Sequence, residues 1–425
     1  MYRPLLLTAM FSMAVSSTVA HANADWVSAV FDHPSLRVQH SAIEKQQWKI
    51  LELEAEKGFD FDIRSSAHLP LAEHFDNSFS RVATYDPYLD LVFSASQTVY
   101  DFGEADSLID AERALQHKAR LAFANGFEQQ THSLFSLVIQ HQKAHQTITI
   151  VDTALADIGL VQGDLVRRFE AGIGTLADIR RTQLSQIDLE TQITQLQNKM
   201  SAVENIISSD YGLAIDSLVS DWNNIEPQLQ LTDTIEALNL RSSAISQGAQ
   251  TSLRHQRSSI AAQKKPKLIV DVNTTLYDVT RSMSNYRVAG EFRLTFPAFD
   301  SGYRSAKMAS ISHAITAEQQ TLEQVVQQKT LDLKTSKRQL DDLELRQQEG
   351  MKKHNNLSLQ LDNMKLALGK TANDHAGLAN LHTQIASAQI DLVSIAFDMQ
   401  QLVLDRVLLS EQIIQQFNVT SDQLP

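Results

Sequence analysis

Residues 287–304 read RVAGEFRLTFPAFDSGYR, an alternating segment that ends in a proline and an Asp-x-Gly turn. Its apolar and polar residues are interleaved: Val288, Gly290, Phe292, Leu294 and Phe296 alternate with Arg287, Ala289, Glu291 and Arg293. Successive side chains of a β-strand point to opposite faces of the sheet. The segment therefore predicts a strand with one apolar face and one charged face, which stops at Pro297.

Four segments of this kind occur in the chain. We expect strands at about 58–69, 88–100, 267–277 and 286–297. About ten alternating residues is the length that a tilted strand needs to cross the hydrocarbon layer of a membrane. The polar face of such strands would line an aqueous lumen with Asp60, Asp62, Asp90, Asp271, Arg287, Glu291 and Arg293. An ordinary amphipathic sheet on a soluble core would show the same alternation.

Four strands are too few to form a membrane-spanning barrel alone. Open sheet edges are not tolerated in lipid, because their backbone groups would have no hydrogen-bonding partner. If these strands cross a membrane, several chains must therefore share one barrel.

A long helical stretch follows each pair of strands. No proline interrupts residues 88–226 or 298–424, and both stretches are rich in good helix formers. We expect helical hairpins at about 103–207 and 303–415. The outgoing helix of the second hairpin is more polar, and Gly350 is expected to interrupt it.

The spacing of apolar residues in these stretches is typical of coiled coils. From Leu134 to Phe169 they recur in alternating steps of three and four, and a second regular seam runs from Leu378 to Leu402. A helix of about 65 residues is on the order of 100 Å long. Such hairpins predict a rod or tube that projects away from the strands.

The two halves of the chain resemble each other. Asp101-Phe102-Gly103 matches Asp300-Ser301-Gly302 at an offset of 199 residues, and a long helical stretch follows each. We expect two internal repeats, over 25–226 with an N-terminal helix and over 227–425 with a helix at about 231–262. The fold class is then mainly α with a small β part, each repeat giving two strands and one coiled-coil hairpin.

The first residues have the features of an export signal. Arg3, an apolar core from Leu5 to Val15 and the small residues near Ala24 predict a secretory signal peptide over 1–24. The rest of the sequence has no run of 18 apolar residues, so no membrane-spanning helix is expected. The chain has no cysteine and a net charge of −13, which argues against disulfides and against a nucleic-acid partner.

The turn motif is similar to a known family signature. Phe296–Arg304 resembles the P-[LI]-[FY]-D-x-G motif of the TolC family of outer-membrane efflux proteins, also called outer membrane factors. The first copy, Gln97–Gly103, has Thr98 where proline is usual. Arg168–Ile179 resembles the family's periplasmic helical tip. The likeness covers essentially the whole chain after the signal.

The resemblance implies a channel with no cofactor. It implies a homotrimer whose protomers each give four strands to one outer-membrane β-barrel, continued by a periplasmic α-barrel. A periplasmic adaptor (membrane fusion) protein and an inner-membrane transporter of RND or ABC type would be its partners, with lipid around the barrel. The chain would lie in the outer membrane of a Gram-negative bacterium, mostly in the periplasm. Drug efflux and type I protein secretion both remain open.

The resemblance also implies functional residues at the helical end. The tip that contacts the adaptor would consist of Ala171, Gly172, Ile173 and Gly369, and the periplasmic aperture of Asp178 and Asp374. The second repeat departs from the family pattern. Asp374 is one position out of register, His375 takes the matched place, and Thr371 replaces an arginine that helps to lock some relatives shut.

Two other classes of protein fit parts of the sequence. A secreted coiled-coil scaffold without a pore would explain the heptads but not the alternating strands. His141 and His145 have the spacing of two zinc ligands on a helix, which would suit a metal-dependent enzyme. Gln142 lies between them where a metalloprotease needs glutamate, and no third ligand is apparent. We therefore expect neither a metal site nor enzymatic activity.

Overall fold

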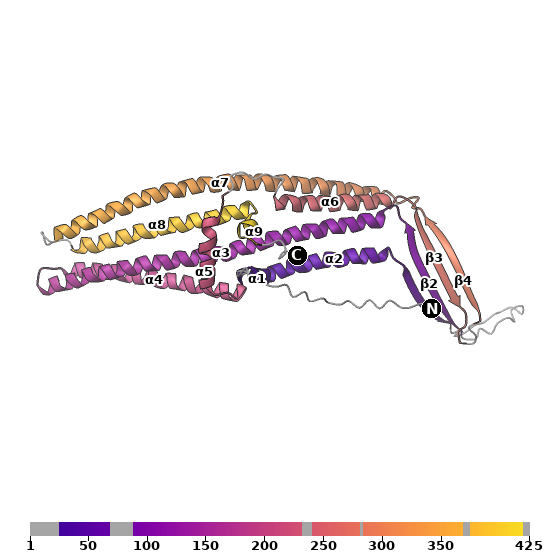
Figure 1. Ribbon diagram of the computed structural model, residues 1–425, viewed down its shortest axis with the longest axis horizontal. Coiled ribbons are helices and arrows are strands. Elements are labelled where there is room, and N and C mark those ends of the chain that lie inside the picture. Colours follow the sequence, from indigo (N-terminus) through magenta and orange to yellow (C-terminus); the bar gives the residue numbers. More distant parts are fainter. Residues whose placement is uncertain (1–24, 69–87, 232–239, 281–283, 369–374, 420–425) are drawn as a thin grey trace, which may run out of the picture.

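The protein is an elongated bundle of helices with a small sheet at one end (Figure 1). The computed structural model describes residues 25–68, 88–231, 240–280, 284–368 and 375–419. The predicted signal peptide lies outside these residues, as do Gly369, Thr371 and Asp374.

Helices make up most of the described chain, and four strands form one antiparallel sheet. The elements are α1 (Asp25–Phe31), α2 (Pro34–Glu56), β1 (Asp60–His68), β2 (Tyr88–Tyr100), α3 (Glu104–Glu170), α4 (Leu176–Tyr211), α5 (Ile215–Ile225), η1 (Glu226–Gln228), α6 (Arg241–Ala262), β3 (Lys267–Leu276), β4 (Tyr286–Thr295), α7 (Tyr303–Leu368), α8 (His375–Leu409) and α9 (Ile413–Gln416). A mainly helical fold with a small antiparallel sheet is thus confirmed.

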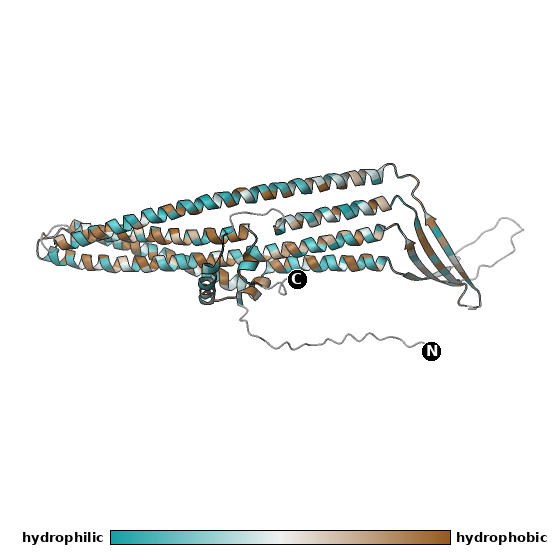
Figure 2. Ribbon diagram, turned by 45° about the horizontal axis from the view of Figure 1, so that its top comes forward, coloured by the Kyte–Doolittle hydropathy of each residue, from teal (hydrophilic) through white to brown (hydrophobic). Residues whose placement is uncertain are grey.

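The helix α3 lies at the centre of the bundle. It packs against α2 and α6 in the half nearer the strands and against α4 and α8 in the other half (Figure 1). With 67 residues, α3 is about 100 Å long. The helix α7 packs against α6 and then α8, and it is visibly more hydrophilic than α8 (Figure 2).

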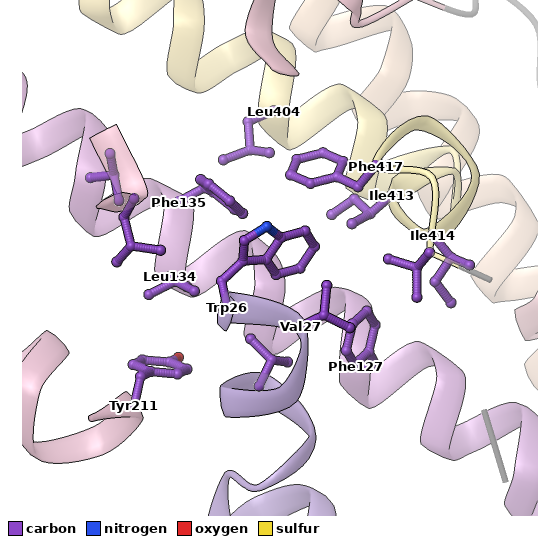
Figure 3. Close-up of a cluster of buried hydrophobic side chains, with 14 of the residues drawn as sticks. Trp26, Val27, Phe127, Leu134, Phe135, Tyr211, Leu404, Ile413, Ile414 and Phe417 are labelled. Atoms are coloured by element: carbon purple, nitrogen blue, oxygen red, sulfur yellow. The ribbon is translucent and has the colours of Figure 1, made fainter. Parts of the chain in front are cut away.

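The largest hydrophobic core lies where α3 changes partners. Phe135 of α3 is fully buried there, and its ring lies 5.3 Å from Trp26, 5.6 Å from Trp222 and 5.2 Å from Phe417, measured between centroids (Figure 3). These rings come from α1, α5 and the residues after α9, so the core joins both ends of the described chain to the central helix. Smaller clusters continue the packing toward the hairpin turns.

Two helices differ from the expected pattern near the middle of the chain. Sequence reasoning missed α5, which is only 11 residues long, although its apolar residues recur at helical spacing and pack against the core: Ile215, Leu218, Val219, Trp222 and Ile225. The helix α6 begins at Arg241 and not at about 231, since Leu240 has an extended backbone (φ −74°, ψ 133°). The residues 232–239 lie outside the described part of the chain.

The expectation that Gly350 interrupts the second hairpin was wrong. The helix α7 runs through this position without a break. A Cβ atom built at Gly350 would lie 2.8 Å from Cδ2 of Leu392 on α8. The glycine therefore allows the two helices to approach closely. The returning helix ends at Leu409, before the expected limit of about 415.

The apolar seam of α3 is also wider than a single heptad stripe. Val138, Ala154 and Val161 are buried although they lie outside the expected seam, while Phe169 at its end is 44% exposed. The reason is that α3 packs between two helices at once, so two adjacent stripes are covered.

Replacing Phe135 with alanine should destabilise the fold by about 3–5 kcal/mol, because the substitution empties the centre of the aromatic cluster. Thermal unfolding of the purified protein would measure this change. Leu160→Ala is the matched control: Leu160 lies on the same helix, is 74% exposed, and should change stability by less than about 0.5 kcal/mol. Equal effects of the two substitutions would contradict the placement of the core.

Candidate functional site

The sheet has strand order β1-β2-β3-β4, with every neighbouring pair antiparallel. The strands β1 and β4 are therefore its two edges. The register sets residues directly opposite one another in rows across all four strands. Phe61, Ala95, Val272 and Gly290 form one such row, and Asp62, Ser94, Asn273 and Ala289 form the next.

One face of the sheet is apolar and uncovered. The rows that point to it carry Phe61, Ile63, Leu91, Phe93, Val270, Val272, Val288, Phe292 and Leu294. Phe61 and Phe93 stack at 6.4 Å between centroids. Phe292 is 78% exposed, and in the described chain no strand residue belongs to a buried hydrophobic cluster. Figure 2 shows the brown strands beyond the ends of the helices.

The opposite face is polar and charged. All seven residues expected there lie on it: Asp60, Asp62, Asp90, Asp271, Arg287, Glu291 and Arg293. One row consists of Asp60, Ser96, Asp271 and Glu291, so three of its four residues are carboxylates. Asp271 is 7% exposed and accepts a hydrogen bond from Arg293 at 2.5 Å, which offsets part of its charge.

Each strand pair ends in a turn that starts a long helix. Asp101 accepts hydrogen bonds from the backbone N–H groups of Gly103 (3.0 Å) and Ala105 (2.8 Å). Asp300 accepts equivalent bonds from Gly302 (3.0 Å) and Arg304 (3.2 Å). Gly103 and Gly302 both have a φ of +82°, which favours glycine.

These backbone bonds also stabilise the charged form of the aspartate. Hydrogen bonds from the backbone of Arg304 and Gly302, with the Arg304 guanidinium beside them, hold the pKa of Asp300 below its ordinary value. A negative charge at a helix N-terminus is favourable. The Asp-x-Gly signature is therefore a helix cap that joins each long helix to its strand.

A cavity of about 350 Å³ lies where α2, β2, α3 and β3 meet. Four of its charged residues form ion pairs: Lys57 lies 2.5 Å from Asp106, and Lys267 lies 2.6 Å from Glu104. The hydrogen bond to Asp106 raises the pKa of Lys57. These pairs join the strand ends to the helices.

The far end of the bundle is a tight turn between α3 and α4. Gly172 has a φ of +74°, and Ile173 donates its backbone N–H to the carbonyl of Arg168 at 2.9 Å. Ile173 is 66% exposed and Phe169 lies beside it, so the turn presents apolar side chains to solvent. Of the four expected tip residues, Ala171, Gly172 and Ile173 share this turn, and Gly369 lies outside the described residues.

Asp178 has a structural role at the start of α4. Thr175 caps this helix by accepting the backbone N–H of Asp178 at 3.2 Å, and its hydroxyl donates to the Asp178 carboxylate at 2.6 Å. Arg181 lies 3.9 Å from the same carboxylate. Asp374, the other expected aperture residue, lies outside the described part of the chain.

The paired histidines have separate surroundings. His141 is buried, and its Nε2 lies 2.9 Å from Oε1 of Glu204 on α4, while His145 is exposed. In the described residues no group of three or more His, Cys, Asp or Glu side chains is placed to hold a metal ion. His132 with Asp405 (2.6 Å) and His382 with Asp157 (3.1 Å) form similar pairs between α3 and α8.

Sequence reasoning missed a buried group of charges beside the central core. Glu128 of α3, which is fully buried, pairs with Arg241 at 2.9 Å and accepts the backbone N–H of Ile414. Glu411 pairs with Lys329 of α7 and accepts the backbone N–H of Ser242. Four helices and the C-terminal turn meet here, and no motif or period marks isolated charges of this kind.

The two buried carboxylates have opposite pKa shifts. Burial raises the pKa of Glu128 despite Arg241. Burial alone would also raise the pKa of Glu411, but the hydrogen bonds from Lys329 and Ser242 outweigh it and hold this pKa below its ordinary value. Glu411 therefore stabilises the fold as a carboxylate.

The fold just described is that of the TolC family of outer-membrane channels, as the sequence resemblance predicted. CusC, whose crystal structures concern transmembrane channel formation, superimposes with a TM-score of 0.77 at 12% identity, covering 96% of this chain and 98% of CusC. The outer membrane protein VceC of Vibrio cholerae gives 0.74 at 16% identity, covering 91% and 95%. The MtrE outer membrane channel of Neisseria gonorrhoeae, solved in its open state, gives 0.73 at 11% identity, covering 91% and 88%.

The likeness is one of structure. No family model and no curated protein matches the sequence. At these identities the superpositions establish the fold over nearly the full length of the chain. None of the described helices is both long enough and apolar enough to cross a membrane.

Replacing Glu411 with glutamine should cost about 3 kcal/mol at pH 7, because Lys329 would lose its buried partner. Since the folded-state pKa of Glu411 is depressed, its contribution is complete above its ordinary pKa and is lost as the pH falls through the folded value. The difference in thermal stability between wild type and variant should therefore shrink from pH 7 to below pH 4. Glu349→Gln, at an exposed site on α7, is the control. A difference that does not depend on pH would contradict this role of the Glu411 charge.

Proposed function

We propose that this protein is a passive export channel of the outer membrane that works as a homotrimer. The observation that carries the proposal is the sheet. Among the described residues nothing covers its apolar face, its opposite face bears the seven expected charged residues and Arg64, and β1 and β4 pair on one side only. A sheet of this kind would be unstable in water and is suited to a lipid boundary with water on the other side.

The open edges favour a barrel shared by several chains, and the family resemblance implies that their number is three. In lipid the unpaired backbone groups of β1 and β4 would need partners, which β4 of one protomer and β1 of the next could supply. Three such sheets would close a barrel with the polar faces inward. The residues Asp60, Asp62, Asp90, Asp271, Arg287, Glu291 and Arg293 would then line the lumen.

The helices would extend the channel through the periplasm. A length of about 100 Å is far more than a compact domain uses, and the edges of the helical layer, α7 on one side and α2 with α4 on the other, carry exposed apolar residues such as Trp48, Leu184 and Leu359. Packing against neighbouring protomers would cover them in an α-barrel.

Two internal repeats, over 25–226 and 227–425, form part of this proposal. Their Asp-x-Gly turns have the same hydrogen bonds and the same glycine conformation, which supports a duplication. Each repeat would then contribute one pair of strands and one helical hairpin to the channel.

The partners would meet the helical tip. We propose that Ala171, Gly172, Ile173 and Gly369 contact a periplasmic adaptor, and that Asp178 and Asp374 lie at the closed aperture. An inner-membrane transporter of RND or ABC type would deliver drugs, other small molecules or secreted proteins, and it would define the cargo. The protein would then contribute a path and no chemistry.

The orientation of the sheet can be tested with two adjacent substitutions. Phe292→Arg places a charge on the apolar face and should block outer-membrane insertion, since a charge facing lipid costs about 2–4 kcal/mol per protomer near the midplane. Glu291→Arg places the same side chain on the polar face and should leave insertion intact while it changes single-channel conductance. Membrane fractionation and planar-bilayer recording measure the two outcomes.

Three other results would contradict the proposal. They are a soluble monomeric wild type, a trimer without conductance, and equal tolerance of arginine at both positions. The second of these would favour a coiled-coil scaffold without a pore.

The tip assignment has its own test. Gly172→Arg adds a bulky charge at a position with a φ of +74° and should abolish export and adaptor co-purification while trimers persist. Gly163→Ala is the control, because Gly163 lies inside α3 with open space around it. Normal export by the Gly172→Arg variant would show that this turn is not the adaptor contact.

A further inference from the structure

Three lysines gather where the second strand pair meets the helices. Lys264 and Lys265 lie between the end of α6 and the start of β3, and Lys307 lies in the first turns of α7. All three are exposed. The amine of Lys264 lies 3.4 Å from the hydroxyl of Ser305, so the α6 end and the α7 start are neighbours.

A β-bulge shows which face of the sheet these lysines border. Between Thr98 and Tyr100 the register of β2 against β3 shifts by one residue, so that Tyr100 lies opposite Leu268 on the apolar face. The ring of Phe102 is 4.6 Å from the ring of Tyr100, and the amine of Lys265 lies 5.2 Å above Phe102. An unbroken line of contacts therefore runs from the apolar face to a lysine amine.

Two of the three lysines, Lys265 and Lys307, are placed over aromatic rings, and Lys264 lies beside a hydroxyl. The amine of Lys307 lies 5.9 Å from the centroid of Tyr303, which is 64% exposed. None of Lys264, Lys265 and Lys307 forms an ion pair within the described chain, whereas nearby Lys57 and Lys267 are both paired. We refer to Lys264, Lys265 and Lys307, with Phe102 and Tyr303, as the lysine rim.

The turn itself does not require this positive charge. At the repeat offset of 199 residues, Lys307 corresponds to Leu108 in the first copy. The segment before the first strand pair, Glu56-Lys57-Gly58-Phe59, is neutral in sum, whereas Lys264-Lys265-Pro266-Lys267 carries three amines. The excess charge belongs to one junction and has no role in capping the helix.

We propose that the lysine rim binds the phosphate groups of anionic phospholipids in the leaflet at the helical end of the sheet. The inference rests on the proposed channel function, which places the apolar face in lipid. Unpaired amines at the border of that face would then lie at headgroup depth, where long lysine side chains reach the interface and exposed aromatic rings are favoured. Each lysine near such a surface improves binding to anionic lipid roughly fivefold.

The order of the helices favours lipid over a second copy of the chain as the partner. Lys264 and Lys265, at the end of α6, lie between α3 and α7 and away from the edges of the helical layer at which protomers would join. Lys307 lies on the edge helix α7, but at its first turns, which adjoin the end of α6. The phosphate group of the lipid would complement the positive charge of the lysines, and its acyl chains would lie against the neighbouring apolar face of the sheet.

The test compares two triple variants of the full-length protein in nanodiscs of phosphatidylcholine with a minor fraction of phosphatidylglycerol. Lys264→Gln, Lys265→Gln and Lys307→Gln together remove the rim, whereas Lys199→Gln, Lys334→Gln and Lys352→Gln remove the same charge from exposed helical sites away from the sheet. Native mass spectrometry measures retained lipids. The preference for phosphatidylglycerol should fall at least tenfold in the rim variant and stay unchanged in the control.

Four outcomes would overturn the inference. These are no anionic preference in the wild type, an equal loss in both variants, displacement of the lipid by soluble glycerol phosphate, and loss of trimers in the rim variant at unchanged lipid preference. The last would mean that the lysines contact a second copy of the chain. Conductance of the wild type in the same lipids tests the channel function separately, so a conducting protein without lipid preference disproves the rim alone.

Discussion

The structure depends on one constraint, which is that the sheet cannot be stable on its own in water. In the described part of the chain its apolar rows meet no helix, its edge strands leave backbone groups without partners, and the buried clusters lie elsewhere. The hydrophobic effect therefore requires a second apolar phase or further copies of the chain at this end of the molecule. The fold of outer-membrane channels satisfies both requirements.

The helical part is a rod of about 100 Å, and it is stabilised by a small hydrophobic core. The helix α3 exchanges α2 and α6 for α4 and α8 at mid-length. The aromatic cluster around Phe135 and the pairs Glu128–Arg241 and Glu411–Lys329 are concentrated at this exchange. Elsewhere the packing consists of smaller apolar clusters, and histidine–carboxylate pairs join neighbouring helices.

Much of the fold could be predicted because its signals are local. Alternation over ten residues located all four strands, and the Asp-x-Gly turns located the starts of both long helices. The register could not be predicted, since it depends on pairing between strands almost 180 residues apart; it alone shows that Asp60, Asp271 and Glu291 share a row. Gly350 was misjudged because a sequence does not distinguish a glycine that allows two helices to pack closely from a glycine that interrupts a helix. Glu128 and Glu411 were missed, because an isolated buried charge leaves no periodic trace.

The concentration of the core at one point along α3 has a mechanical consequence. From Phe135 to Glu170 the helix extends roughly 50 Å beyond that point, at 1.5 Å per residue. The molecule is thus a lever with its fulcrum at the aromatic cluster. A tilt of about 5° there would displace the distal loop by roughly 4 Å, about the size of one side chain. The arm toward the strands, from Phe135 back to Glu104, is about 46 Å long at the same rise per residue, so a rocking motion about the cluster would move the two ends by similar distances in opposite directions.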